Sequence, residues 1–97
     1  MKNATQLEVL EMTVHLFAVA HTALEQKATI ATRIRNEARA ELNFARRTDM
    51  EAAAEAAFDR ACDEEQLCIQ KVNVAFDMYL DALAKFNAAQ QVSKVVA

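Results

Sequence analysis

The 97-residue sequence contains no glycine, no proline and no tryptophan. Sheet hairpins need residues with positive φ, and phosphate-binding loops and nucleophile elbows need glycine where the backbone turns sharply or approaches a ligand. These absences exclude sheet-rich folds, nucleotide-binding loops and elbow-type hydrolases. The one serine, Ser93, lies near the C-terminus, and neither cysteine has a histidine nearby in the sequence. We therefore expect no enzymatic activity, no catalytic residues and no cofactor.

The chain also lacks an excess of positive charge. Its net charge is −3 and its pI is about 5.3, whereas domains that bind nucleic acid by neutralising phosphates are usually strongly basic. Nucleic acid is therefore an unlikely partner. Cys62 and Cys68 are six residues apart on one predicted helix, point in different directions and cannot pair with each other. Two free thiols are typical of a reducing compartment.

No secretory leader is visible, because the first residues run directly into amphipathic helix without an apolar core segment or a cleavage site. Residues 67–83 form the most apolar window, but they include Lys71, Asp77 and Asp81. Charges at those positions disfavour a membrane span. We therefore expect a cytoplasmic protein that does not enter a membrane.

Alanine is abundant, and it is the strongest helix former. Capping-box sequences begin at Thr5 and at Thr48, each with a glutamate three residues later. The chain is therefore predicted to be all-α and to form one domain over residues 1–97. This domain is a long antiparallel hairpin with one helix from about 5 to 46, a turn at 47–48 and a second helix from about 49 to 92. Its heptad repeat is expected to be irregular.

The two ends of the predicted hairpin differ in composition. Near the turn the first helix is basic and the second is acidic, and alanine separates the charges. The candidates for electrostatic contacts are Arg33, Arg35, Arg39, Asp59, Asp63 and Glu64. We expect these charges to pair across the hairpin. Two alternatives are an acidic surface that mimics nucleic acid and an arginine face that binds RNA.

At the open end, large apolar residues cover more of each helix than a single packed neighbour requires. The first helix has one stripe that includes Leu10, Phe17 and His21, and a second that includes Val9 and Leu16. A separate stripe lies on the far side of the second helix. This excess predicts a homo-oligomer, most simply a four-helix-bundle homodimer. The expected partner or oligomer contacts are Leu10, Phe17, His21, Leu67, Val74 and Met78.

Both histidines have a glutamate four residues away, His15 after Glu11 and His21 before Glu25. The di-iron signature of helical bundles is instead Glu-x-x-His with additional inward glutamates, which the chain does not contain. We therefore expect no metal site. A metal-binding bundle that uses these histidines remains a second alternative.

Since the chain has no loop in which to build a site, any function must lie on helix faces. The favoured function is a non-enzymatic protein–protein interaction module. Such a module would act as a small regulator, adaptor or inhibitor, including the kind that phages direct at a host protein. The identity of its protein partner is not encoded in any motif.

Overall fold

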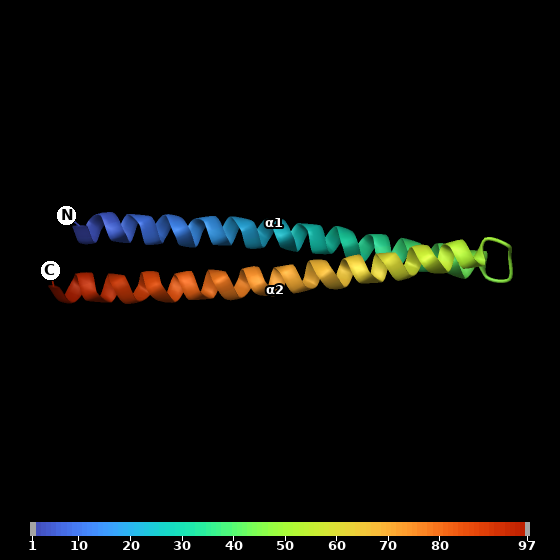
Figure 1. Ribbon diagram of the computed structural model, residues 1–97. Helices are drawn as coiled ribbons and strands as arrows, with labels where there is room; N and C mark the ends of the chain where they lie inside the picture. Colours follow the sequence, from blue (N-terminus) through green and yellow to red (C-terminus); the bar gives the residue numbers. More distant parts are fainter. Residues whose placement is uncertain (1, 97) are drawn as a thin grey trace. The chain divides into compact units, whose positions relative to one another are not determined.

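The computed structural model describes residues 2–96 and the side chains of residues 5–94. It has two helices, α1 (Lys2–Ala45) and α2 (Glu51–Val96), and the described residues contain no strand. The helices pack against each other as a helical hairpin (Figure 1). This confirms the predicted all-α hairpin.

The helix boundaries differ from the predicted ones at three places. Helix α1 begins at Lys2, so Thr5 lies inside it and does not start it. Helix α2 begins at Glu51 and continues to Val96, beyond the predicted end at 92. The connection therefore covers residues 46–50, which is longer than the predicted turn at 47–48. Without proline or glycine at these positions, no residue stops either helix early.

The second capping box exists, but its hydrogen bonds are each shifted by one residue. The Thr48 hydroxyl accepts a hydrogen bond from the Met50 amide at 3.2 Å, and the Glu51 carboxylate accepts one from the Arg47 amide at 3.2 Å. The Thr48 amide donates to the Ala45 carbonyl at 3.0 Å and so closes the end of α1. Arg47 has a φ of 67°, in the left-handed region that favours glycine. The turn is therefore built on a capping threonine and a strained arginine.

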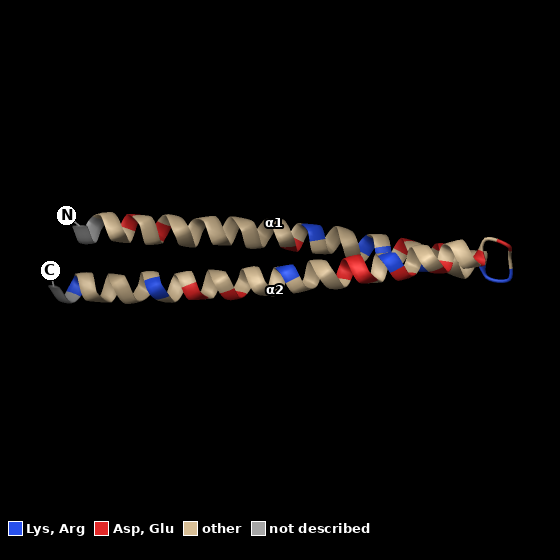
Figure 2. Cartoon of the chain, in the orientation of Figure 1, with Lys and Arg blue, Asp and Glu red and all other residues tan. Residues whose placement is uncertain are grey.

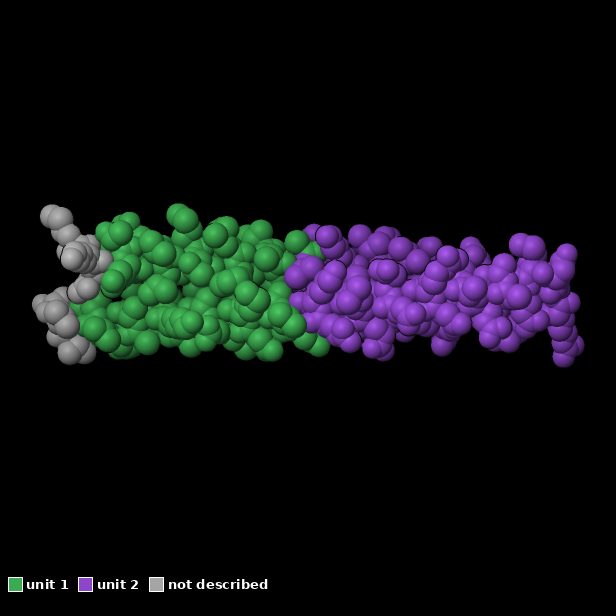
Figure 3. Space-filling view, in the orientation of Figure 1, with its two compact units in different colours: residues 1–23, 73–97 green, residues 24–72 purple. Residues whose placement is uncertain are grey.

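The chain divides into two compact units (Figure 3). Unit 1 comprises residues 1–23 and 73–97, and unit 2 comprises residues 24–72. Each unit combines a segment of α1 with a segment of α2.

Within both units the less exposed positions recur at alternating spacings of three and four residues. In unit 1 they include residues 7, 10, 14, 17 and 21 of α1 and 75, 79, 82, 86, 89 and 93 of α2, and the flanking positions 13, 18 and 83 are also less exposed. In unit 2 they include residues 24, 28, 31, 35, 38, 42 and 45 of α1 and 51, 54, 58, 61, 65, 68 and 72 of α2, together with the flanking positions 32, 57 and 62. This is the a/d pattern of a coiled coil. The expectation of an irregular heptad repeat was therefore wrong.

The repeat was overlooked because many inside positions are not occupied by large apolar residues. Most of the buried residues are alanines, and one is charged: they are Ala31, Ala38, Leu42, Ala61, Glu65, Ala75 and Ala82. Alanine contributes little apolar area when it is buried. The inside of this hairpin is therefore thin, and most large apolar side chains remain at least partly accessible.

Candidate interaction surfaces

Large apolar side chains are exposed along both helices, and they are most concentrated in unit 1. In unit 1 the exposed members are Val9, Met12, Leu16, Val19, Val74, Phe76, Met78, Leu80 and Val92. In unit 2 they are Ile30, Ile34, Phe44, Met50, Leu67 and Ile69. Scattered exposed apolar residues are normal on a monomer, but a contiguous patch marks an interaction site.

The heptad register assigns these residues to faces of the hairpin. We take Leu7 as an a position of α1 and Tyr79 as an a position of α2, so that a and d lie inside. In an antiparallel coiled coil the g positions of the two helices lie on one side of the pair and the e positions on the other. A small cavity of about 160 Å³ agrees with this, because Gln6 and Val92, both at g, line it together.

One side of unit 1 carries exposed large apolar residues on both helices. Its g and adjacent c positions carry five exposed large apolar residues, which we call the apolar face: Val9, Leu16, Val74, Met78 and Val92. The other side of unit 1 is mixed. There α2 presents Phe76 and Leu80, whereas α1 presents polar residues that include Glu8 and His15. The apolar face is therefore the most uniform candidate contact in unit 1.

The predicted contact residues fall into two groups. Leu67, Val74 and Met78 are exposed on α2, and two of them belong to the apolar face. Leu10, Phe17 and His21 instead occupy inside positions of α1 and are half-buried within the chain. The His21 ring lies 5.2 Å from the Phe76 ring of α2. The structure therefore places His21 in contact with α2 of the same chain, and Leu10 and Phe17 at inside positions of the same heptad repeat.

Two residues of the apolar face, Val9 and Leu16, were not among the predicted contacts. Their stripe was visible in the sequence, together with Met12 and Val19, and these four side chains are 54–64% exposed. The sequence pattern alone could not decide which of the two α1 stripes faces α2. The larger residues of the first stripe, Phe17 and His21, made it the more prominent one.

Unit 2 contains a polar cluster between the two helices. Glu65 is buried, its carboxylate accepts a hydrogen bond from the Thr32 hydroxyl at 2.6 Å, and it pairs with Arg35 at 2.9 Å. The Arg35 guanidinium also donates to the Asn36 side chain at 3.0 Å, but its buried Nε has no hydrogen-bond partner among the residues that the structure describes. A charged group at an inside position tends to fix the register of a coiled coil. We assign this structural role to the cluster.

The expected pairing of charges across the hairpin is largely wrong. Among the described side chains, the ion pair of Arg35 with Glu65 at 2.9 Å joins the two helices, and Arg46 of the connection pairs with Glu51 at the start of α2 at 3.8 Å. The Arg39 guanidinium lies over the Phe58 ring at 5.7 Å. The remaining candidates, Arg33, Asp59, Asp63 and Glu64, take part in no ion pair with residues 5–94. Figure 2 shows that both blue and red segments occur on the part of the hairpin nearer the connection. The charges of these four residues are available to solvent or to a partner.

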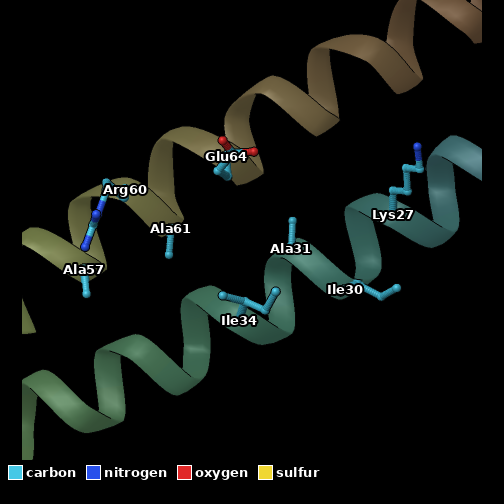
Figure 4. A pocket seen from close by; sticks show the side chains of 8 residues that line it. All are labelled: Lys27, Ile30, Ala31, Ile34, Ala57, Arg60, Ala61 and Glu64. Carbon is cyan, nitrogen blue, oxygen red and sulfur yellow. The ribbon is translucent and has the colours of Figure 1, made fainter.

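A groove of about 360 Å³ lies between the helices of unit 2. In Figure 4 Ala31 points toward α2, while Ala57 and Ala61 point back toward α1. Because these side chains are small, an open space remains between the helices. The residues that line the groove are Lys27, Ile30, Ala31, Ile34, Ala57, Arg60, Ala61 and Glu64. The groove combines exposed isoleucines with charges of both signs, so it does not select a ligand by charge.

The described part of the chain offers little support for metal binding or thiol chemistry. No group of three or more histidine, cysteine or acidic residues lies close enough to hold a metal ion within that part. Cys62 and Cys68 are half-buried free thiols.

One helix is long and apolar enough to cross a membrane by length and composition. A window of 18 residues within Thr5–Ala45 of α1 has a mean hydropathy of 1.3, and none of it is buried. The most apolar window was expected at 67–83, and it lies in α1 instead. Signal sequences and core helices of soluble proteins meet the same criteria, so this observation is weak evidence for a membrane span.

Comparison with known proteins adds no relative from which a function could be inferred. The sequence matches no protein-family model, no curated protein and no solved structure.

Proposed function

We propose that this chain is a non-enzymatic protein–protein interaction module that acts as a small regulator, adaptor or inhibitor. Its working form is a homodimeric helical bundle that binds a protein partner. The observation that supports the proposal is the distribution of apolar residues in unit 1. There the buried residues are alanines, while large apolar side chains remain accessible on the helix faces.

Accessible side chains of this kind weaken a hairpin that stands alone. A fully buried valine, leucine or methionine side chain contributes about 1.5–3 kcal/mol relative to an exposed one. Val74 is 58% exposed and Met78 is 46% exposed. Much of the burial free energy of each side chain is therefore gained only when a partner covers it. A protein that covers the apolar face would therefore stabilise the hairpin as it binds.

The shape of the surface favours a helical partner. Exposed apolar residues recur at heptad spacing along α1 and α2, which is the arrangement that receives the apolar stripe of another helix. Leu67, in unit 2, occupies the same c position on α2 as Val74 in unit 1. Within unit 1 the proposed partner contact on α2 thus consists of Val74 and Met78, and Leu67 is proposed as a separate contact in unit 2.

The proposal is tested by changing the partner contact and measuring what the protein captures. The purified wild-type chain and a Val74→Glu/Met78→Glu variant are each immobilised and exposed to extract from the source cells. We expect a bound protein with the wild type and its loss with the variant, because two carboxylates would be desolvated in an apolar contact. Leu80→Glu is a control on the opposite side of α2. Equal capture by wild type and double variant would contradict the proposed function.

A second candidate function is supported by the unpaired charges of unit 2. Arg33, Asp59, Asp63 and Glu64 form no ion pair with described residues, so they could contact a charged partner. Such a partner is either a nucleic acid or a protein whose nucleic-acid site the acidic residues mimic. Washing the captured material at about 50 mM and about 500 mM salt separates the candidates, because electrostatic binding is screened at high salt. Retention at high salt supports the apolar contact.

A further inference from the structure

We propose that the apolar face of unit 1 is covered by the same face of a second copy of this chain. This inference rests on the proposed function and specifies the occupant of the contact at Val74 and Met78. The occupant is the second copy of the homodimer, and the captured protein binds the dimer that this contact forms. The two faces meet around a twofold axis, so that four helix segments surround a common apolar layer. The residues that form this layer are Val9, Leu16, Val74, Met78 and Val92.

The first argument is the width of the apolar stripes. A two-stranded coiled coil needs apolar residues at a and d only, whereas a helix in a bundle also carries them at a flanking position. In unit 1 both helices carry exposed large apolar residues on the g and c side, at c on α1 and at c and g on α2. On the opposite side α2 alone does so, at Phe76 and Leu80, whereas α1 carries Glu8 and His15. We therefore place the additional helices on the apolar face.

The second argument is charge. Among the described side chains, the c and g positions of unit 1 carry two charges, Asp81 and Lys85, and these form an ion pair at 2.9 Å. The apolar face is therefore nearly neutral, and a copy of itself meets no net repulsion. A charged partner would be selected by charges of the opposite sign, which this face does not present. Self-association is the pairing that fits this surface best.

The third argument is area. At 1.5 Å per residue, the 22 described residues of α1 in unit 1 are ~33 Å long, and two helices of ~10 Å diameter are ~20 Å wide. The face therefore measures ~650 Å², which is close to the ~800 Å² that each partner buries in a standard stable interface. One copy of unit 1 is large enough to form a specific dimer through this face.

The experiment compares substitutions at two residues of α2 that have similar exposure but lie on different faces of the hairpin. Met78 and Leu80 are two residues apart on α2 and are 46% and 44% exposed. We expect the wild type to sediment as a dimer, Met78→Lys to weaken the dimer at least ~30-fold, and Leu80→Lys to change it by less than ~3-fold. Leu16→Lys, on the same face of α1, should weaken the dimer as Met78→Lys does. Circular dichroism shows whether each variant remains helical.

Charge complementation identifies the second copy as the occupant. Val74→Lys/Met78→Lys chains should be monomeric alone, and so should Val74→Glu/Met78→Glu chains. Mixed together, they should form a heterodimer, detected by native mass spectrometry, because opposite charges then meet across the twofold axis. This outcome does not depend on either variant keeping full stability alone.

The inference is overturned if the wild type has the mass of one chain at ~100 μM, if Met78→Lys and Leu80→Lys weaken the dimer equally, or if the mixture yields no heterodimer. These failures differ from a failure of the proposed function. A monomeric wild type that still loses its captured protein in the Val74→Glu/Met78→Glu variant would overturn the dimer alone. A dimer with the expected face dependence whose double variant captures the same proteins as the wild type would overturn the proposed function alone.

Discussion

The two units of the hairpin use the same heptad repeat with different chemistry. Unit 1 contains seven charged residues, namely Lys2, Glu8, Glu11, Asp77, Asp81, Lys85 and Lys94, and all the others belong to unit 2. Unit 2 buries alanines, one leucine and a glutamate, whereas unit 1 buries Ala75 and Ala82. Unit 2, which has more charged residues, therefore buries more residues than unit 1 does. Unit 1, which has fewer charges, exposes more large apolar side chains.

This contrast separates two sources of stability. In unit 2 the Thr32–Glu65–Arg35 cluster and the buried alanines lie within one chain. In unit 1 much of the apolar area that could stabilise the fold is still accessible. Regions with little buried apolar area open at a low free-energy cost. We therefore expect unit 1 to depend on association for its stability and unit 2 to depend on it less.

The largest expected effect in unit 2 comes from removing the buried carboxylate. Glu65→Ala leaves the Arg35 guanidinium and the Thr32 hydroxyl without their partner. Because the Arg35 side chain is 33% exposed, we expect a loss of about 2 kcal/mol in the free energy of unfolding, below the ~3–5 kcal/mol of a fully buried pair. Urea denaturation at one fixed chain concentration measures it.

Glu64→Ala provides the matched control for this prediction. Glu64 is the neighbouring residue, carries the same charge, is exposed and forms no ion pair with described residues. Its removal should change the free energy of unfolding by less than ~0.5 kcal/mol. If the two alanine variants were equally stable, the cluster would contribute nothing and the contrast between the units would lose its main support.

The fold class could be predicted from the sequence because the absent glycine and proline left helices as the only long elements, and Thr48 marked the turn. The regular heptad could not be recognised, because alanines and polar residues such as Arg35 and Glu65 occupy inside positions that a search for large apolar residues overlooks. The choice between the α1 stripes depended on packing with α2. The pairing of charges depended on side-chain conformations, and Arg39 shows the difficulty, since it lies over Phe58 and forms no ion pair with an acidic residue of the described part of the chain.

A smaller effect is expected at the turn of unit 2. Arg47 adopts a φ of 67°, which costs a non-glycine residue ~1–2 kcal/mol. Arg47→Gly should raise the free energy of unfolding by about 0.5–1 kcal/mol, because relief of that strain exceeds the greater flexibility of glycine in the unfolded chain. The Arg47 amide can still donate to Glu51 in this variant. Arg47→Ala keeps a Cβ and should show no such gain. Equal denaturation midpoints for the two variants would show that the backbone at Arg47 is not strained.

The smallest effect is expected in unit 1, at the Asp81–Lys85 pair. Both side chains are about two-thirds exposed, so Lys85→Ala should lower the free energy of unfolding by only ~0.3 kcal/mol, as is usual for an exposed pair four residues apart on a helix.

The effect of Lys85→Ala on association is more informative, because Asp81 then leaves a net charge on each apolar face. Two such faces repel each other, and the dimer should weaken about 2-fold to 5-fold at low salt and regain its wild-type strength at high salt. Lys94→Ala removes the same charge from a b position outside the apolar face and should leave association unchanged. Sedimentation of both variants at two salt concentrations therefore tests whether neutrality of this face, and not the ion pair itself, allows unit 1 to meet its own copy.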